Sequence, residues 1–243
     1  MPRFTLLFLT MLLSAATAFA QPTFRLGLRG GLNRASSTVE PSRISSSQYY
    51  YSASKSALFA WQAGAVLEVA FRRFSLQPAL VFSQKGEQFD AATSMSGVAG
   101  VSSTELSTVN RSNWLELPVN MVYTLHGFQL FAGPYVALAV GGRQRGTLME
   151  ASPFERFGPF DYDKKLYYGK GTTNRRLDAG VNFGLGYRKG PLQVQLGYGL
   201  GLRNLHQAFS PYIVSENPHY NQFDDDAAYN RLVQFTGVYF FKL

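Results

Sequence analysis

Residues 177–203 read LDAGVNFGLGYRKGPLQVQLGYGLGLR, and this stretch decides the fold. On each side of a break at 188–191, apolar side chains occupy every second position, with polar residues or glycines between them. Because successive side chains of a β-strand point to opposite faces, a period of two predicts strands. The stretch therefore predicts two antiparallel strands joined by a tight turn, each with an apolar face and a face of glycine and polar residues.

The same alternation occurs in six further segments of the chain. They are residues 24–32, 59–71, 75–83, 115–123, 129–140 and 233–243. Three tight connections, at 72–73, 124–127 and 188–191, separate strands whose facing apolar residues should pair. The expected pairs are Phe71 with Phe74, Tyr123 with Phe128, and Tyr187 with Leu192. An even number of residues between partners keeps both side chains on the same face, so the pairs agree with the alternation.

The other four connections are long and rich in Ser, Gly, Asn, Tyr and charge. They cover residues 33–58, 85–113, 142–176 and 204–230. Short and long connections alternate along the chain, so antiparallel strands place all the long connections at one end. The connection lengths thus predict an up-and-down arrangement of eight strands.

The composition restricts the class of protein. The chain has 243 residues, of which 46% are hydrophobic, 15% aromatic and only 16% charged, unlike a disordered chain. No internal run of about 18 apolar residues is present, which argues against a membrane-spanning helix. The absence of cysteine excludes a disulfide framework, a thiolate metal site and a lipid-anchored N-terminal cysteine.

The first twenty residues have the features of an export signal. Arg3 supplies a positive start, residues 4–13 are mostly apolar, and Ala18-Phe19-Ala20 is a small-x-small cleavage pattern before Gln21. We therefore expect a signal peptide at 1–20 and one barrel domain at 21–243. Removing Arg3 lowers the formal net charge from +8 to +7. An exported chain meets little nucleic acid, so the expected partners of this charge are anionic lipid or polysaccharide.

Alternation alone does not say which face of the strands lies inside. A soluble lipocalin-type barrel turns its apolar face inward, and a membrane barrel turns it outward. Three features favour the membrane: a glycine-rich polar face that suits a narrow interior, aromatic residues at the ends of the apolar face, and runs of roughly nine residues. The predicted fold is an all-β, eight-stranded antiparallel up-and-down transmembrane β-barrel. It is expected to be a monomer in the outer membrane, with three short periplasmic turns and four long extracellular loops.

Four short motifs resemble a known family. They are Ser83-Gln84-Lys85-Gly86, Trp114-Leu115-Glu116-Leu117-Pro118, Gly133-Pro134-Tyr135 and Gly184-Leu185-Gly186-Tyr187. Their order and spacing, with the aromatic last strand, resemble the PorT-like outer-membrane β-barrel family of Bacteroidota over nearly all of the mature chain. The resemblance implies an outer-membrane barrel of eight strands without a catalytic motif, and one group of the family is linked to protein secretion. The terminal Leu243 departs from the aromatic residue that ends many such strands.

Six charged residues fall on the glycine-rich face. They are Arg25, Arg29, Glu68, Glu116, Asp178 and Arg203. Buried charges must pair or form hydrogen bonds, so these residues indicate either a selectivity ring in a small-solute channel or a set of ion pairs that plugs the interior. Eight strands leave room for little more than side chains, which favours the plug. Arg25 and Glu68 should lie at similar depth on neighbouring strands, so we expect a direct ion pair between them.

Residues that could support catalysis are few. His206 and His219 share the last long connection with Ser210, Ser215 and Asp224, which keeps a lipid-modifying acyl-transfer enzyme as an alternative. No spacing motif supports that alternative, and His126 lies in a tight turn. Asp224-Asp225-Asp226 lacks the glycine-bearing pattern of a calcium loop. We therefore expect no enzyme activity, catalytic residue, cofactor or metal.

Basic residues gather at the strand ends that carry the long connections. Lys85, Arg111 and Arg231 are examples, and the strongest candidates for contacts with lipid phosphates are Arg143, Arg145, Arg175 and Arg176. Arginine can grip a phosphate through two parallel hydrogen bonds. The opposite strand ends are also basic, so general placement of long cationic side chains at an interface is an equal alternative. The predicted function is a non-enzymatic outer-membrane protein with a plugged interior. Its loops would contact lipopolysaccharide or a surface or secretion protein, support membrane integrity, or assist secretion.

Overall fold

The computed structural model describes residues 22–38, 43–46, 48–169, 172, 174–205 and 228–241. Its strands are β1 (Thr23–Ser37), β2 (Arg43–Ser45), β3 (Tyr49–Phe71), β4 (Phe74–Gly97), β5 (Gly100–Leu125), β6 (Phe128–Ala151), β7 (Arg156–Leu166), β8 (Leu177–Lys189), β9 (Leu192–Gly201) and β10 (Asn230–Phe240). Within these ranges, no helix is both long enough and apolar enough to cross a membrane. The expected signal peptide at 1–20 and the terminal Leu243 lie outside the described residues.

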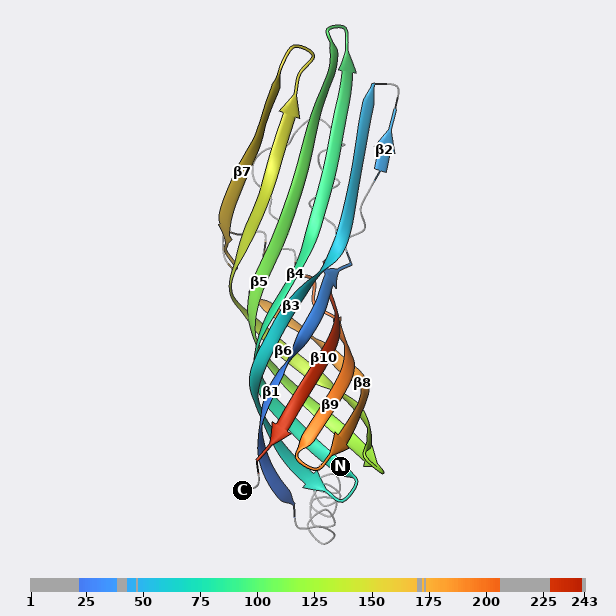
Figure 1. Ribbon diagram of the computed structural model, residues 1–243, viewed down its shortest axis with the longest axis vertical. Helices are drawn as coiled ribbons and strands as arrows, with labels where there is room; N and C mark the ends of the chain where they lie inside the picture. Colours follow the sequence, from blue (N-terminus) through green and yellow to red (C-terminus); the bar gives the residue numbers. More distant parts are fainter. Residues whose placement is uncertain are drawn as a thin grey trace, which may run out of the picture.

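Eight of the strands close into a ring. The order around the ring is β1, β10, β9, β8, β6, β5, β4 and β3, and β3 pairs back with β1. Every pairing is antiparallel, which confirms the predicted up-and-down barrel (Figure 1). Closure gives each ring strand a partner on both sides, so the backbone polar groups are satisfied without water. β2 pairs only with β3 and β7 only with β6, both outside the ring.

The three tight turns lie where they were predicted, but two of the expected pairs are wrong. Phe71 does pair with Phe74, whereas Tyr123 pairs with Leu130 and Tyr187 with Val194. In the last two hairpins the strands continue two residues farther and end in two-residue turns. Favoured turns of this length need a positive φ at their first central residue. His126 and Gly190 supply it, with φ of 50° and 61°.

Three of the long connections, predicted to be loops, are mostly strand. The strands β3, β4, β5 and β6 continue past the ring, and β2 and β7 flank them. We call this part the extension; it comprises residues 49–57, 86–97, 100–112 and 142–151, together with β2 and β7. These segments are rich in Ser and Thr and show no apolar alternation, so the sequence did not predict strands there. Because β4 and β5 are already paired in the ring, their continuations stay in register as far as Gly97 opposite Gly100. The fourth connection, 204–230, lies mainly outside the described residues.

Irregular pairing marks the boundary between the barrel and the extension. The register shifts between Ala57 and Gln62 in the β3–β4 pair, and at Asn113 in the β5–β6 pair. Such bulges bend a strand and increase its twist. Near the same level, β6 exchanges its partner β8 for β7, between Leu138 and Gly142. The extension therefore rises from one end of the ring, here called the mouth, and the tight turns close the other end (Figure 1).

The outer face of the barrel is apolar and the inner face is polar. Phe128 and Leu130 of β6 are 70% and 58% exposed, whereas Gln129 between them is buried. Aromatic pairs stand near the turn end, Phe74 with Tyr123 and Phe128 with Tyr187, at ring-centroid distances of 5.0 and 5.2 Å. An apolar band with aromatic residues at its border is the surface that a membrane barrel presents to lipid. The predicted outward direction of the apolar face is confirmed.

Glycines on the inner face make room for aromatic side chains from β6. A Cβ atom on Gly184 would lie 2.8 Å from the ring of Phe131, and one on Gly180 would lie 2.7 Å from the ring of Tyr135. Both aromatic residues point inward and are buried. The glycine-rich face is thus the complement of large inward side chains, and the interior is filled by packing as well as by polar contacts.

Candidate functional site

The barrel interior holds a first cluster of charges near the tight turns, which we call the turn-end cluster. Glu68 of β3 has a side chain that is 2% exposed, and its carboxylate accepts from both Arg25 and Arg188. The Arg25 Nη1 to Glu68 Oε2 distance is 2.9 Å, so the ion pair expected from the sequence is present. Arg188 Nη1 lies 2.7 Å from each carboxylate oxygen. One acid is therefore shared by two arginines.

Contacts in this cluster cross the full width of the ring. Gln77 of β4 and Gln193 of β9 exchange two side-chain hydrogen bonds, of 3.2 and 3.1 Å. These strands are four places apart in the ring of eight, which is the largest possible separation. Glu68 on β3 and Arg188 on β8 are also four places apart. Side chains that meet across a diameter occupy the middle of the lumen at that level.

A second cluster, the mouth-end cluster, lies where the barrel joins the extension. Lys85 Nζ is 2.7 Å from Glu116 Oε1 and 3.4 Å from Asp178 Oδ2, and all three residues are buried. The hydroxyl of Tyr135 and the Nδ2 of Asn230 also donate to Asp178, at 3.1 and 2.7 Å. Lys85 Nζ also lies over the ring of Tyr135, 5.2 Å from its centroid. Strands β4, β5, β6, β8 and β10 are thereby tied together across the interior.

The structure brings four of the six predicted interior charges into these clusters. Arg25, Glu68, Glu116 and Asp178 make the contacts above. Arg29 donates a long hydrogen bond of 3.4 Å to Gln234 and has no direct ion pair within the described part of the chain. Arg203 is exposed. The prediction for Arg203 is wrong because β9 ends at Gly201, so the alternation that placed it inside stops before it.

Sequence reasoning missed two central cations. Lys85 was expected among the basic residues at one membrane interface, and Arg188 among those at the opposite strand ends. Both stand at positions whose side chains point into the barrel. Lys85 is two residues after the inward Ser83, and Arg188 pairs with the inward Gln193. This alternation was the signal that could have found them. Lys85 was missed because the apolar alternation stops at Ser83, although β4 continues to Gly97. Arg188 was missed because it stands next to the end of β8, where a long side chain can equally turn to solvent.

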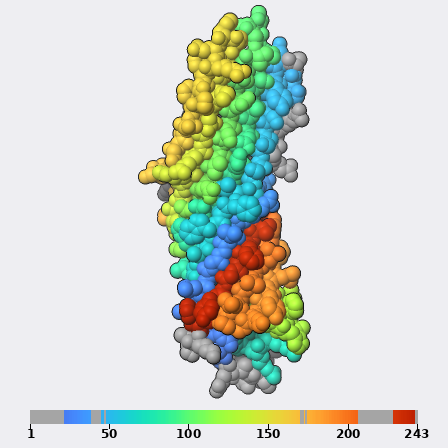
Figure 2. All heavy atoms as spheres, viewed as in Figure 1, coloured from blue at the N-terminus to red at the C-terminus, as the bar shows by residue number. Residues whose placement is uncertain are grey.

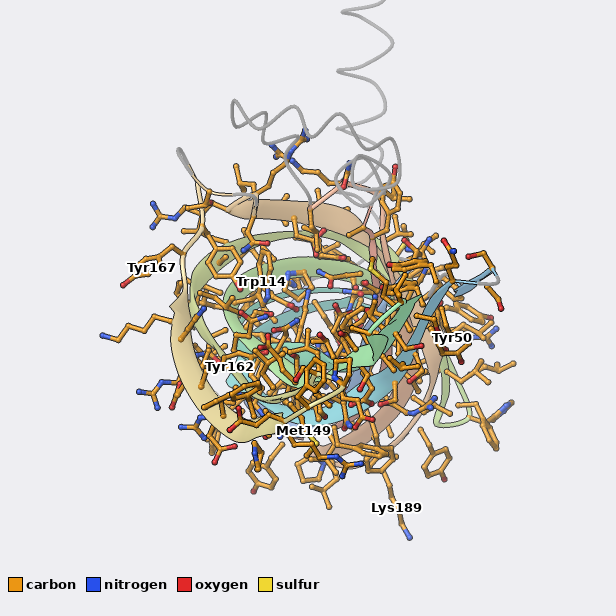
Figure 3. All side chains as sticks on the ribbon, turned by 90° about the horizontal axis from the view of Figure 1, so that it is seen from above. Tyr50, Trp114, Met149, Tyr162, Tyr167 and Lys189 are labelled. Carbon is orange, nitrogen blue, oxygen red and sulfur yellow. The ribbon has the colours of Figure 1, made fainter. Side chains whose placement is uncertain are left out.

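Above the mouth-end cluster lies a cavity of about 310 Å³, here called the mouth cavity. Its walls come from the end of β1, from the middle of β4 and β5, from Gln144 of the extension, and from the segment that contains Tyr168 and Arg175. Lys85, Trp114 and Asn230 also line it, and two of these three belong to the mouth-end cluster. Seen from above, Trp114 lies within the ring of strands, whereas Tyr167 points away from it (Figure 3).

A separate basic hollow of about 600 Å³ lies on the outer surface at the start of the extension. Arg111, Arg143, Arg145 and Lys165 line it, next to apolar Val140 of the barrel. Asp163 pairs with two of these arginines, at 3.5 Å from Arg143 and 3.0 Å from Arg145, and all three side chains are largely exposed. The other two predicted phosphate contacts lie apart from it, since Arg175 lines the mouth cavity and Arg176 is an exposed residue before β8.

The residues considered for catalysis receive no structural support here. His206, Ser210, Ser215, His219 and Asp224–Asp226 lie outside the described residues. His126 occupies the two-residue turn between β5 and β6, as expected. Among the described residues, no three or more His, Cys, Asp or Glu side chains gather in a way that could hold a metal ion.

The family described as outer membrane protein beta-barrel domain matches residues 19–207, which is most of the chain. The chain belongs to this family. Neisserial surface protein A (NspA) is 9% identical over 92% of this chain and 99% of that chain, with a TM-score of 0.38. The TodX deltaS2S3 mutant, a monoaromatic hydrocarbon channel, is 10% identical over 94% and 92%, with a TM-score of 0.23. No curated protein matches the chain.

Membership of the family places the protein in the outer membrane and gives the two faces of its barrel a physical meaning. The exposed apolar band is the surface in contact with lipid, and the two charged clusters lie in the lumen of an outer-membrane barrel. Charges in such a place are costly unless they are paired. Glu68 and Lys85 each have two oppositely charged partners, so both clusters meet that requirement.

Proposed function

We propose that this outer-membrane barrel is a non-conducting, non-enzymatic membrane anchor, and that its extension is the surface through which it acts. The observation that carries the proposal is the pair of contacts across the diameter of the lumen, Gln77 with Gln193 and Glu68 with Arg188. A channel needs a continuous aqueous path, and an eight-stranded barrel has little space beyond its side chains. The filled lumen leaves the extension as the functional surface.

The size and position of the extension support this role. Strands β4 and β5 are 24 and 26 residues long, well beyond the roughly 9–11 residues that cross a membrane. Figure 2 shows β1, β9 and β10 packed side by side in the barrel and the extension rising above them. We propose that the extension faces the cell exterior and the tight turns the periplasm, because known outer-membrane barrels have short periplasmic turns.

Two measurements test the proposal. In planar lipid bilayers, the purified protein should give no steady ion conductance, while an open porin in the same bilayer shows that the assay works. Trypsin added to intact cells should cut the extension, for example after Arg156 or Lys164, and spare Arg72 and Arg73. Reproducible, salt-dependent open levels would favour the channel instead. Cleavage at the tight turns with the extension spared would reverse the orientation.

We further propose that the basic hollow on the outer surface binds phosphates of lipopolysaccharide. Four cations, Arg111, Arg143, Arg145 and Lys165, surround it, and Asp163 is the acid paired there. Its contact with Val140 puts it at the upper border of the apolar band, at the depth of lipid phosphates if the extension faces outward. Arginine recognises phosphate through paired, charge-assisted hydrogen bonds.

We also propose that the chain belongs to the PorT-like group of Bacteroidota barrels, with a role in secretion as one outcome. The support is that three of the four motifs behind the resemblance supply the mouth-end cluster: Lys85, Glu116 and Tyr135. Loss of a secreted protein from the medium when the gene is deleted, restored by the wild-type chain, would support the secretion role. Unchanged secretion would argue against it.

A further inference from the structure

The mouth cavity is closed at its base, so it is a pocket and not part of a passage. Its base contains Lys85 and Asn230, which are 2% and 7% exposed and bind Asp178 beneath them. A cavity of about 310 Å³ is at the small end of the roughly 300–1,000 Å³ that is usual for small-molecule sites. Its size therefore suits a ligand of one or two rings.

The walls of the cavity are lined mainly by uncharged polar groups. Side-chain amides come from Asn110, Gln144, Asn174 and Asn230, and hydroxyls from Ser36, Ser37 and Ser112. The buried Oδ1 of Asn110 has no hydrogen-bond partner within the described part of the chain. That oxygen is closed off from solvent, but Asn110 as a whole is only half-buried and lines the cavity, so its side-chain amide can meet a ligand hydroxyl there.

Two aromatic residues form a corner of the same cavity, in which Trp114 is 2% exposed and the half-buried Tyr168 presents the accessible ring. The rings of Trp114 and Tyr168 meet edge to face at a centroid distance of 5.9 Å. The indole Nε1 of Trp114 is already used, since it donates to Ser112 at 2.9 Å. Burial raises the pKa of Tyr168 to about 12, so its hydroxyl keeps its proton near neutral pH. An aromatic corner beside amides and hydroxyls matches a ligand with apolar ring faces and a hydroxylated rim.

The charges at the cavity are mostly satisfied by the protein itself. Lys85 is paired with two carboxylates, and Glu87 is paired with Lys55 at 2.8 Å. Only Arg175 among the described lining residues is a cation without an ion pair. A ligand with several charges would have to displace one of these pairs, which costs free energy, because Arg175 can balance only a single negative charge. The lining therefore favours a ligand that is neutral and rich in hydroxyl groups.

From this geometry we propose that the mouth cavity is a binding site for a mono- or disaccharide. Sugar hydroxyls would bond to Asn110 and Gln144, and one ring face would pack against Tyr168. The proposal goes beyond the proposed anchor function and uses the closed lumen only as the base of the pocket. Sugar binding and ion conductance are separate measurements, so either proposal can fail alone.

The chain offers a direct reporter, because it has two tryptophans and Trp61 is on the lipid-facing side, 48% exposed. In Trp61→Phe, the fluorescence comes from Trp114 alone. The full mature chain should be purified in an amine-oxide detergent, because glucoside and maltoside detergents carry sugar headgroups that would compete. Titration with glucose and with maltose should give a saturable change in fluorescence for at least one of them, and glutamate should give none.

Variants on β5 separate the site from general effects on folding. Asn110→Ala in the Trp61→Phe background should weaken sugar binding roughly tenfold or more, because the cavity loses a side-chain amide that bonds to the sugar. Asn113→Ala is the matched control: Asn113 lines the outer hollow, so this change should leave sugar binding as it was. Calorimetric titration of the wild-type protein with the same two sugars checks the affinities without a substitution at Trp61. No saturable response to either sugar, a response to glutamate alone, or equal loss in both variants would overturn the proposal.

Discussion

The barrel and the extension are built from the same strands but show different side-chain patterns. In β6, most inner positions of residues 128–140 are buried and alternate with outer positions, whereas in residues 142–151 no side chain is buried and the alternation stops after Gly146. The backbone pairing continues through both parts. The difference shows that hydrogen-bonded pairing alone does not impose alternation. Lipid on one side and a packed lumen on the other impose it, and the extension has neither.

Two carboxylates make the comparison quantitative, because each is paired with two arginines. Glu68 in the lumen pairs with Arg25 and Arg188, and its side chain is 2% exposed. Asp163 in the extension pairs with Arg143 and Arg145, and its side chain is 43% exposed. Ion pairs at an exposed surface contribute about 0–1 kcal/mol, whereas removing one partner of a buried pair costs about 3–5 kcal/mol. Burial, and not the number of partners, should decide the effect.

The largest effect is therefore expected for Glu68→Gln. This change leaves two cations in the lumen without an acid, and we expect a loss of about 3 kcal/mol in the free energy of unfolding. The lower end of the range applies because Arg25 remains 38% exposed. Asp163→Asn, the matched change in the extension, should cost less than about 1 kcal/mol. Urea unfolding in lipid vesicles measures both, and equal losses would contradict the division into lumen and surface.

The next largest difference in stability between the barrel and the extension is expected when a charge is placed on the outer face. Val136 and Met149 lie on β6 and are 50% and 37% exposed, one in the barrel and one in the extension. Val136→Arg puts a cation in the apolar band, where we expect a loss of about 2–4 kcal/mol near the membrane midplane. Met149→Arg should change stability by no more than about 0.5 kcal/mol, as at most surface positions.

The same unfolding measurement checks this pair of variants, with folding yield into vesicles as a second readout. A large loss for Met149→Arg would mean that lipid or a packed partner covers the extension. Little or no loss for Val136→Arg would mean that the apolar band is not in contact with lipid. Either result would remove the physical basis of the comparison.

The sequence was sufficient to predict the barrel because a lipid-facing strand needs a regular alternation of apolar and polar residues. Apolar and polar side chains must alternate along each ring strand. The polarity of residues such as Leu130 and Gln129 is therefore enough to predict which side of the barrel they face. The pairing of Arg25 with Glu68 followed from depth and parity. The extension shows no such alternation, because its strands meet water and need no apolar face. Segments such as 86–97 therefore had the composition expected of loops.

The predicted ends of the strands were the other failure, and again the reason is physical. Arg203 was wrongly placed inside because β9 ends before it, at Gly201. Lys85 was wrongly placed at the interface because β4 continues beyond the apolar alternation, as far as Gly97. The mouth cavity could not be predicted from the sequence either. Its lining combines residues from Ser36 to Asn230, which come together only when the ring closes. How the ring closes depends on the register of its strands. In two of the three hairpins the observed register differs by two residues from the one that the sequence predicted.

The smallest effect on stability, and the most specific effect on binding, is expected in the basic hollow. Changing Arg111, Arg143, Arg145 and Lys165 to Gln removes exposed charges whose ion pairs with Asp163 contribute about 0–1 kcal/mol. Folding should be nearly unchanged, but lipopolysaccharide should co-purify in much smaller amounts if phosphate is bound there. Arg72→Gln, Arg73→Gln and Lys189→Gln together, at the turn end, form the matched control and should leave the lipopolysaccharide content unchanged. If both sets of changes lower lipopolysaccharide equally, the cations act only by bulk charge. If neither does, they rest at the interface without recognising phosphate, and the extension must act through another part of its surface.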